Sequence, residues 1–175
     1  MELAEGYSKK RVYGSGPVPC DVMIIGEAPG AEEDESGIPF YGKAGQILNS
    51  GLKQAGISRN DVFVTNTVPF RPPGNRNPRL GEFIKVSNLL VEDYKEVKPK
   101  FVLILGAVAL SFLTNLDGGI TANRGWLDPM RVAFPMNTRV FATFHPSFLN
   151  YRPDMGKEFT EDLKIFSESV LTLSR

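Results

Sequence analysis

Four short runs of apolar residues recur along the chain, at residues 22–25, 62–65, 101–105 and 140–144. They are rich in Val, Ile and Phe, and they are continuous instead of alternating with polar residues. Runs of this kind are typical of strands that are covered on both faces, as in a parallel sheet between helices. The pattern therefore predicts four buried parallel strands.

Segments of helical period separate the predicted strands. The first has apolar side chains three and four residues apart, and Gly56 is a natural stop for it, after Ala44, Ile47, Leu48, Leu52 and Ala55. Longer stripes of the same period occupy residues 80–97 and 159–173, and a further helix is expected from Gly106 to residue 113. This alternation predicts an α/β fold, a three-layer α/β/α sandwich around a central four-stranded parallel sheet. A length of 175 residues suits one domain over residues 1–175.

Composition narrows the class of protein. The chain is 42% hydrophobic and 23% charged, as expected for a globular protein, and no apolar run is long enough to cross a bilayer. Its first residues lack the order of a secretory signal, and its single cysteine excludes a disulfide framework or an all-cysteine metal site within one chain. We therefore expect a cytoplasmic protein that does not bind membranes.

Charge is balanced overall but unevenly distributed. Twenty basic residues match twenty acidic ones, so net charge neither supports nor forbids binding to nucleic acid. Basic residues recur at 9–11 and in the stiff, Pro-rich loop 71–78, which is either a plain surface loop or a contact for phosphate oxygens. The acidic run at residues 32–35 is expected to be a solvated loop face.

Polar residues and glycine follow the predicted strands at their carboxyl ends. Glu27, Asn66, Gly106 and His145 close the first, second, third and fourth strand, respectively. Open α/β sheets bind ligands at this edge, so Glu27, Asn66 and His145 should meet at one rim. His145, the single histidine, precedes Pro146; a lone histidine is often structural, but here we expect its imidazole to face the rim.

A glycine-rich connection of about eighteen residues follows the first strand, which is long for a loop without a function. A phosphate cradle is disfavoured, because the glycine spacing fits neither dinucleotide fingerprint nor P-loop and Lys43 lacks the P-loop context. Phe40 in this loop is either a core residue or a stacking surface for a base. Asn66 is either a turn residue or a reader that offers a donor and an acceptor.

Taken together, these segments resemble the uracil-DNA glycosylase superfamily, most closely its family 4 enzymes, which carry an iron–sulfur cluster. The matching stretches are Gly26-Glu27-Ala28-Pro29-Gly30, the run Gly-Ile-Pro-Phe-Tyr-Gly-Lys-Ala-Gly at 37–45, Thr65-Asn66, Arg-Pro-Pro-Gly-Asn-Arg at 71–76, Leu105-Gly106 with Ala109, and His145-Pro146-Ser147. They occur in the family's order over roughly residues 12–170.

The resemblance implies a uracil pocket at the strand ends and a role for each matching residue. Phe40 would stack on a flipped base and Asn66 would bond its Watson–Crick edge. Glu27, with the backbone of Gly26 and Ala28, would position the attacking water, and His145 would donate to O2 of the departing uracil. The loop 146–150 would wedge into the duplex with Phe148 or Leu149 at its tip. The further DNA contacts would be Arg71, Arg76, Ser147 and Arg152.

Two positions depart from the pattern. Family 4 holds its cluster with four cysteines, one of them at the position of Phe70, so we expect no cofactor and no metal here, with apolar packing around Phe70 instead. Ala28 stands where the best-known uracil-excising family has aspartate. Family 4 also lacks this aspartate, so the proposed activation of water would depend more strongly on Glu27. A bacterium or a large phage is the expected source of such a cluster-free relative.

The resemblance implies a monomeric enzyme that excises uracil from single- or double-stranded DNA by base flipping, without cutting the strand. Two alternatives stay open. One is a catalytically silent DNA-binding module associated with replication or repair. The other is a glycosylase for thymine, hypoxanthine or xanthine, since Gly30 leaves room where a bulky residue could block a 5-methyl group.

Overall fold

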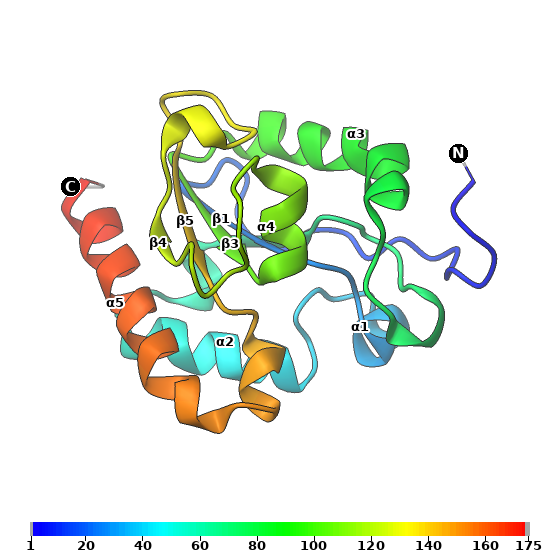
Figure 1. Ribbon diagram of the computed structural model, residues 1–175, viewed down its shortest axis with the longest axis horizontal. Helices are drawn as coiled ribbons and strands as arrows, with labels where there is room; N and C mark the ends of the chain where they lie inside the picture. Colours follow the sequence, from blue (N-terminus) through cyan, green and yellow to red (C-terminus); the bar gives the residue numbers. More distant parts are fainter. Residues whose placement is uncertain (1, 174–175) are drawn as a thin grey trace.

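The computed structural model describes residues 2–173 and joins five strands in one sheet, in the order β2–β1–β3–β5–β4 (Figure 1). The strands are β1 (Val22–Gly26), β2 (Phe63–Asn66), β3 (Phe101–Leu105), β4 (Gly125–Trp126) and β5 (Arg139–Thr143). The first, second, third and fifth pair in parallel, which confirms the four predicted runs. The edge strand β4 runs antiparallel to β5 and went unpredicted, because two residues are too few to show a period.

Five α-helices complete the fold over residues 2–173. They are α1 (Ala31–Ser36), α2 (Lys43–Gln54), α3 (Leu80–Val97), α4 (Ala107–Leu113) and α5 (Gly156–Leu173). The last four confirm the predicted helical stripes, and α5 begins one turn ahead of its first apolar residue, Phe159. Figure 1 shows α2 and α5 on one face of the sheet and α3 and α4 on the other. No helix within residues 2–173 has the length and apolar character needed to cross a bilayer.

Successive strand residues face two separate cores. In β1, Ile24 packs into the core shared with α2 and α5, whereas Met23 and Ile25 pack into the core shared with α3 and α4. All five residues of β1 are buried, as are those of β3. Because side chains alternate along a strand, burial on both faces needs a helix layer on each side. The three-layer sandwich predicted from the sequence is confirmed.

The acidic run at residues 32–35 lies at the surface as expected, but it belongs to helix α1, so the expectation of a loop was wrong. Three carboxylates lie in its first turn, where the helix dipole favours negative charge. The Glu33 carboxylate also accepts hydrogen bonds from the backbone amides of Gly30 (3.0 Å) and Gly42 (2.6 Å). Since α1 buries none of its residues, it shows no hydrophobic period that could have revealed it.

The strand order reverses between β1 and β3. The chain passes from β1 to β2 on one side and then returns to place β3 on the other side of β1. In open α/β sheets the crevice beyond the carboxyl ends of such a strand pair is the usual ligand site. Glu27 directly follows β1 and Gly106 directly follows β3, so both lie at this crevice.

Candidate active site

A cavity of about 360 Å³ opens at the carboxyl edge of the sheet. Among the residues predicted for the site, Ala28, Phe40, Asn66 and His145 line it. The volume falls in the range of cavities that hold small organic ligands. The structure therefore brings together side chains from the first loop, β2 and the segment after β5, as expected from the strand ends.

Gly26 allows Phe40 and Asn66 to approach one another. A Cβ atom on Gly26 would lie 2.5 Å from Phe40 Cζ and 2.7 Å from Asn66 Oδ1, too close for any side chain. Asn66 and Phe40 are only 5% and 8% exposed. The role of Gly26 is thus to give room to two side chains of the cavity wall.

The backbone of Phe40 adopts a left-handed conformation, with φ of 56°. That conformation is costly for a residue with a side chain and persists only where the surroundings enforce it. The Phe40 backbone packs directly on α2, because Gly45 lies so close to the Phe40 carbonyl that any Cβ would overlap it. The Phe40 ring lies beside the His145 imidazole, with ring centroids 5.9 Å apart and planes inclined by 26°. Phe40 is therefore a fixed wall of the cavity.

His145 is held as one neutral tautomer. Its Nδ1 accepts a hydrogen bond from the backbone amide of Ser147 at 3.1 Å, and the Ser147 hydroxyl lies 2.7 Å from the same atom. A backbone amide can only donate, so Nδ1 carries no proton and the ring proton resides on Nε2. Burial lowers the pKa of His145 from 6.5 to about 4. At neutral pH the residue is an uncharged N–H donor.

Glu27 and His145 meet around Gly106, whose φ is +94°. A Cβ atom on Gly106 would lie 2.7 Å from Glu27 Oε1 and 2.8 Å from His145 Cβ. Burial raises the pKa of the Glu27 carboxyl, while the Val108 amide at the start of α4 lowers it in part. Glu27 does not line the cavity itself, but its Oε1 lies beside the same glycine as His145 Cβ.

The loop that follows β2 holds the end of β1 in place. The Thr67 hydroxyl and the Val68 amide both donate to the Glu27 carbonyl, at 2.7 and 3.1 Å. The Thr67 amide also donates to the Gly26 carbonyl at 2.9 Å. These bonds extend the pairing of β1 with β2 past the last strand residue and fix the backbone from which the Glu27 side chain projects.

Two basic residues predicted to contact DNA are bound within the protein. Arg76 donates to both Glu82 oxygens, at 2.6 and 3.0 Å, and this guanidinium is the main reason that the pKa of Glu82 falls to about 2. Arg71 donates through Nε to Asn75 Oδ1 at 2.7 Å. The charge of Arg76 is thus matched by Glu82, while Arg71 forms no ion pair with a carboxylate of residues 2–173.

The loop predicted to wedge into DNA forms a short 3₁₀ helix, Pro146–Asn150. The Phe148 ring stacks on Phe144, with centroids 5.1 Å apart, and both Phe148 and Leu149 pack against the core, half-buried. Tyr151, which follows this helix, is a large aromatic side chain that is 84% exposed. Both side chains predicted for the tip are therefore only partly exposed, and the role of Phe148 or Leu149 as a wedge stays a prediction.

Two other residues predicted to contact DNA belong to the same loop. The Ser147 hydroxyl and amide both face His145, which makes Ser147 a support for the imidazole. Arg152 is exposed and forms a surface ion pair with Asp154, at 2.9 and 2.7 Å. An exposed pair of this kind exchanges readily for another anion, so Arg152 stays a predicted DNA contact.

Several residues of the cavity were missed by sequence reasoning, namely Glu33, Lys43, Asn75 and Asn150. Glu33 was hidden in the acidic run, and Lys43 was considered only as a P-loop lysine. Asn75 has a φ of 56°, a conformation that asparagine adopts more readily than most residues. The one signal available for it was its place after glycine in a Pro-rich loop.

A four-cysteine iron–sulfur cluster does not fit this chain. The sequence holds one cysteine, Cys20, which is buried and directs its thiol to the carbonyls of Asp61 and Val22, at 3.2 and 3.3 Å. Phe70 packs with Leu3 and Tyr7 against the α3 and α4 core. Within residues 2–173 no group of three or more His, Cys, Asp or Glu side chains is placed to hold a metal ion.

Comparison with known proteins gives a consistent result. Residues 13–166 match the model of the uracil DNA glycosylase superfamily. A type-4 uracil-DNA glycosylase of Pyrobaculum aerophilum is 37% identical over 164 residues, which cover 91% of this chain and 83% of that protein. One of Archaeoglobus fulgidus is 34% identical over 161 residues, covering 90% and 80%. A DNA polymerase of Bacillus phage SP01 is 28% identical over 170 residues, covering 95% of this chain but 18% of the polymerase.

Proposed function

Because the chain belongs to the uracil DNA glycosylase superfamily, we propose that it hydrolyses the N-glycosidic bond of uracil in DNA and leaves an abasic site. The observation that carries this proposal is the content of one cavity. An aromatic wall (Phe40), an amide reader (Asn66) and a neutral imidazole donor (His145) line it together. A flat, uncharged base with polar edges suits this set of groups.

The cavity binds the base only after it has left the duplex. Uracil inside the stack cannot reach Asn66, which lies 5% exposed at the end of β2. Once flipped, the base stacks on Phe40, and the Asn66 amide pairs with O4 and N3–H of its Watson–Crick edge. Cytosine presents a donor where uracil has O4, so the fixed amide also discriminates between the two bases.

The reaction breaks the bond between C1′ and N1, and the electron pair leaves with the base. Negative charge then develops at uracil O2, where His145 Nε2–H donates a hydrogen bond. Since burial lowers the pKa of His145 to about 4, the imidazole serves as a neutral donor and needs no proton uptake beforehand. A preorganised donor of this kind lowers the activation free energy by about 3 to 4 kcal/mol.

Water completes the reaction by adding to C1′, and the proton that it gives up as the sugar hydroxyl forms neutralises the departing uracil anion, so that neutral uracil is released. Positive charge develops on the sugar before this addition, so a nearby carboxylate stabilises it. Glu27, whose Oε1 lies near His145 Cβ around Gly106, is the carboxylate that we propose for that role. Its deprotonated form is the active one.

The pH profile follows from these two groups. Burial raises the pKa of Glu27 above 4.5, so kcat/KM should fall as the pH drops through a midpoint above that value. His145 should add no inflection near 6.5, because its pKa lies near 4. Steady-state measurements of kcat/KM from acid to neutral pH test the expected fall due to Glu27 and the expected absence of an inflection due to His145. A midpoint below 4.5, or a clear inflection at 6.5, would refute these assignments.

DNA is proposed to lie across the carboxyl edge of the sheet. Arg71, which forms no ion pair with a carboxylate of the described residues, and Arg152, which exchanges its surface partner, are the proposed phosphate contacts. Phe148 or Leu149, which are partly exposed, or the exposed Tyr151 would fill the gap left by the flipped base. These contacts stay predictions.

The experiment that tests the function is a glycosylase assay on matched oligonucleotides that carry uracil, thymine, hypoxanthine or xanthine at one position. Alkali then cleaves every abasic site. We expect cleavage of the uracil substrate in single and double strands. If only an oligonucleotide with another base were cleaved, the enzyme would be specific for that base instead of uracil. A uracil oligonucleotide left uncut by folded protein would refute the proposal.

A second candidate is a DNA-binding module without turnover. The similarity to a stretch of a phage DNA polymerase favours it, because that stretch lies within a much longer protein. Such a module would bind DNA with strongly salt-dependent affinity and release no base. The same assay, run beside a binding titration at two salt concentrations, separates the two candidates.

A further inference from the structure

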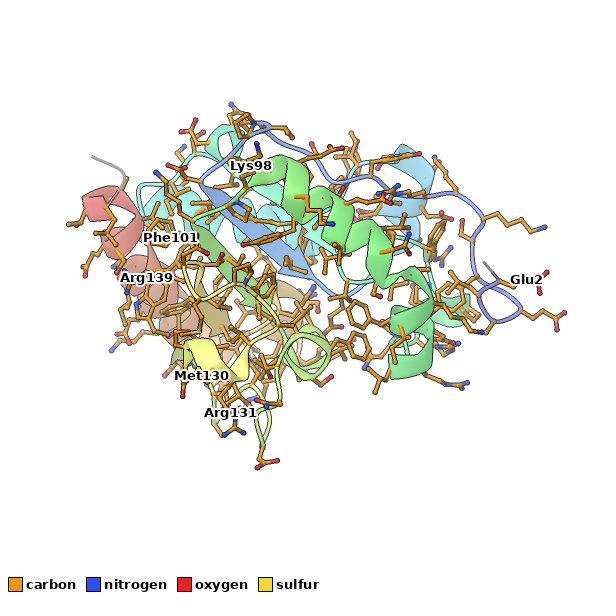
Figure 2. All side chains as sticks on the ribbon, turned by 90° about the horizontal axis from the view of Figure 1, so that it is seen from above. Glu2, Lys98, Phe101, Met130, Arg131 and Arg139 are labelled. Carbon is orange, nitrogen blue, oxygen red and sulfur yellow. The ribbon has the colours of Figure 1, made fainter. Side chains whose placement is uncertain are left out.

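An extended segment, residues 3–12, crosses two walls of the base cavity, and we call it the N-terminal strap. It forms turns and extended backbone without a helix or strand. Figure 2 shows it leaving Glu2 at the end of the molecule, beside the segment that leads into α3. Its hydrogen bonds reach the loop 69–79 on one side and α1 on the other.

The strap holds the loop 69–79 through backbone bonds. The Val12 amide donates to the Pro69 carbonyl at 2.8 Å, and the Ser8 amide donates to the Arg71 carbonyl at 3.0 Å. This loop carries Asn75, which lines the cavity. Apart from the short 3₁₀ turn Pro73–Asn75 it has no regular structure, so its position depends on such contacts.

A polar cluster strengthens the same attachment. The Tyr7 hydroxyl donates to Glu82 Oε2 at 2.7 Å, and the Arg76 guanidinium lies over the Tyr7 ring at 5.4 Å while it binds Glu82. Arg76 directly follows Asn75. Tyr7 therefore ties the strap to α3 through Glu82 and to the cavity wall through Arg76.

On the other side the strap holds α1. The Ser8 hydroxyl donates to Asp34 Oδ1 at 2.6 Å, and Lys10 Nζ donates to the Glu35 carbonyl at 2.9 Å. The same helix carries Glu33, which lines the cavity and accepts bonds from the Gly30 and Gly42 amides. Because α1 buries no residue, it has no apolar anchor of its own.

We propose that Tyr7 and Ser8 are positioning residues that set the distance between the two walls of the base cavity. They are neighbours in the strap, yet the Tyr7 side chain contacts Glu82 and the Arg76 guanidinium, whereas the Ser8 hydroxyl bonds to Asp34 on α1. Neither residue lines the cavity, so each acts through another: Tyr7 through Asn75 and Ser8 through Glu33. The proposed effect on base binding rests on the proposed function, whereas the effect on the walls does not.

Amide hydrogen exchange of the free protein tests the effect on the walls. Ser8→Ala should speed exchange in residues 30–36, and Tyr7→Phe should speed it in residues 70–79, each by roughly two- to tenfold, the effect of one hydrogen bond. The matched control is Arg11→Gln, which removes a strap contact to Asp93 (3.7 Å) on α3, a helix that contributes no residue to the cavity lining. It should leave both segments unchanged.

Inhibition by free uracil tests the effect on base binding. Both wall variants should raise the inhibition constant of uracil, and the KM for a uracil oligonucleotide, by roughly two- to tenfold with little change in kcat. A loss of stability alone would lower the active fraction and leave KM unchanged. Exchange and inhibition constants equal to those of Arg11→Gln would overturn the proposal. Faster exchange at the walls without uracil binding would keep the positioning role and refute the proposed function.

Discussion

Replacing Asn66 by aspartate should lower uracil excision by about a thousandfold while the fold stays intact. At 5% exposure the side chain lies at the bottom of the cavity, where a carboxylate would face uracil O4 with a negative charge. The exchange removes the donor and adds repulsion in a site where water cannot screen it. The volume of the side chain hardly changes, so the loss reports hydrogen bonding and charge.

Asn49→Asp is the matched control for this substitution. Asn49 is exposed on α2, and the same chemical exchange there should leave excision within about twofold of the wild-type rate. Single-turnover excision and thermal unfolding of both variants give the comparison. If folded Asn66→Asp excised uracil at nearly the wild-type rate, Asn66 would not be the residue that recognises the base.

Gly106→Ala should lower excision by roughly a hundredfold, because it displaces the carboxylate and the imidazole together. A Cβ at this position would lie 2.7 Å from Glu27 Oε1 and 2.8 Å from His145 Cβ, so both side chains must move. A shift of about 1 Å in catalytic groups is enough for an effect of this size. The KM should change less than kcat, since Phe40 and Asn66 stay in place.

The control for Gly106→Ala is Gly125→Ala. Gly125 has a similarly positive φ of +107° but no atom within 4 Å of the added Cβ, so alanine there introduces only the backbone strain. Both variants should lose stability, by about 1 to 2 kcal/mol, and only Gly106→Ala should lose activity. Equal rates for the two variants would show that the approach of Glu27 and His145 around Gly106 is unimportant.

The sheet and its long helices were predictable because burial on both faces leaves a clear sequence pattern. The runs that became β1 and β3 are apolar at every position, and the stripe that became α3 extends over eighteen residues. Helix α1 could not be found in this way. Its stability comes from the dipole, from the strap and from the bonds of Glu33, none of which produces an apolar period.

The site was predictable to the extent that strand ends define it. Asn66 and His145 line the cavity as expected, since residues at the carboxyl edge of a parallel sheet converge. Phe148 and Arg76 show what a linear sequence conceals. The Phe148 ring stacks on Phe144, and the Arg76 guanidinium binds Glu82. Both partners come from the tertiary structure, which a local sequence pattern does not reveal.

The most direct test is quantification of free uracil released from a single-stranded oligonucleotide with one uracil, by mass spectrometry, beside the abasic strand. Wild-type protein should release one uracil per strand and turn over repeatedly, and Asn66→Asp purified in the same way should release almost none. Equal, trace amounts of uracil from both proteins, with folding intact, would contradict a uracil-excising site at the carboxyl edge of the sheet.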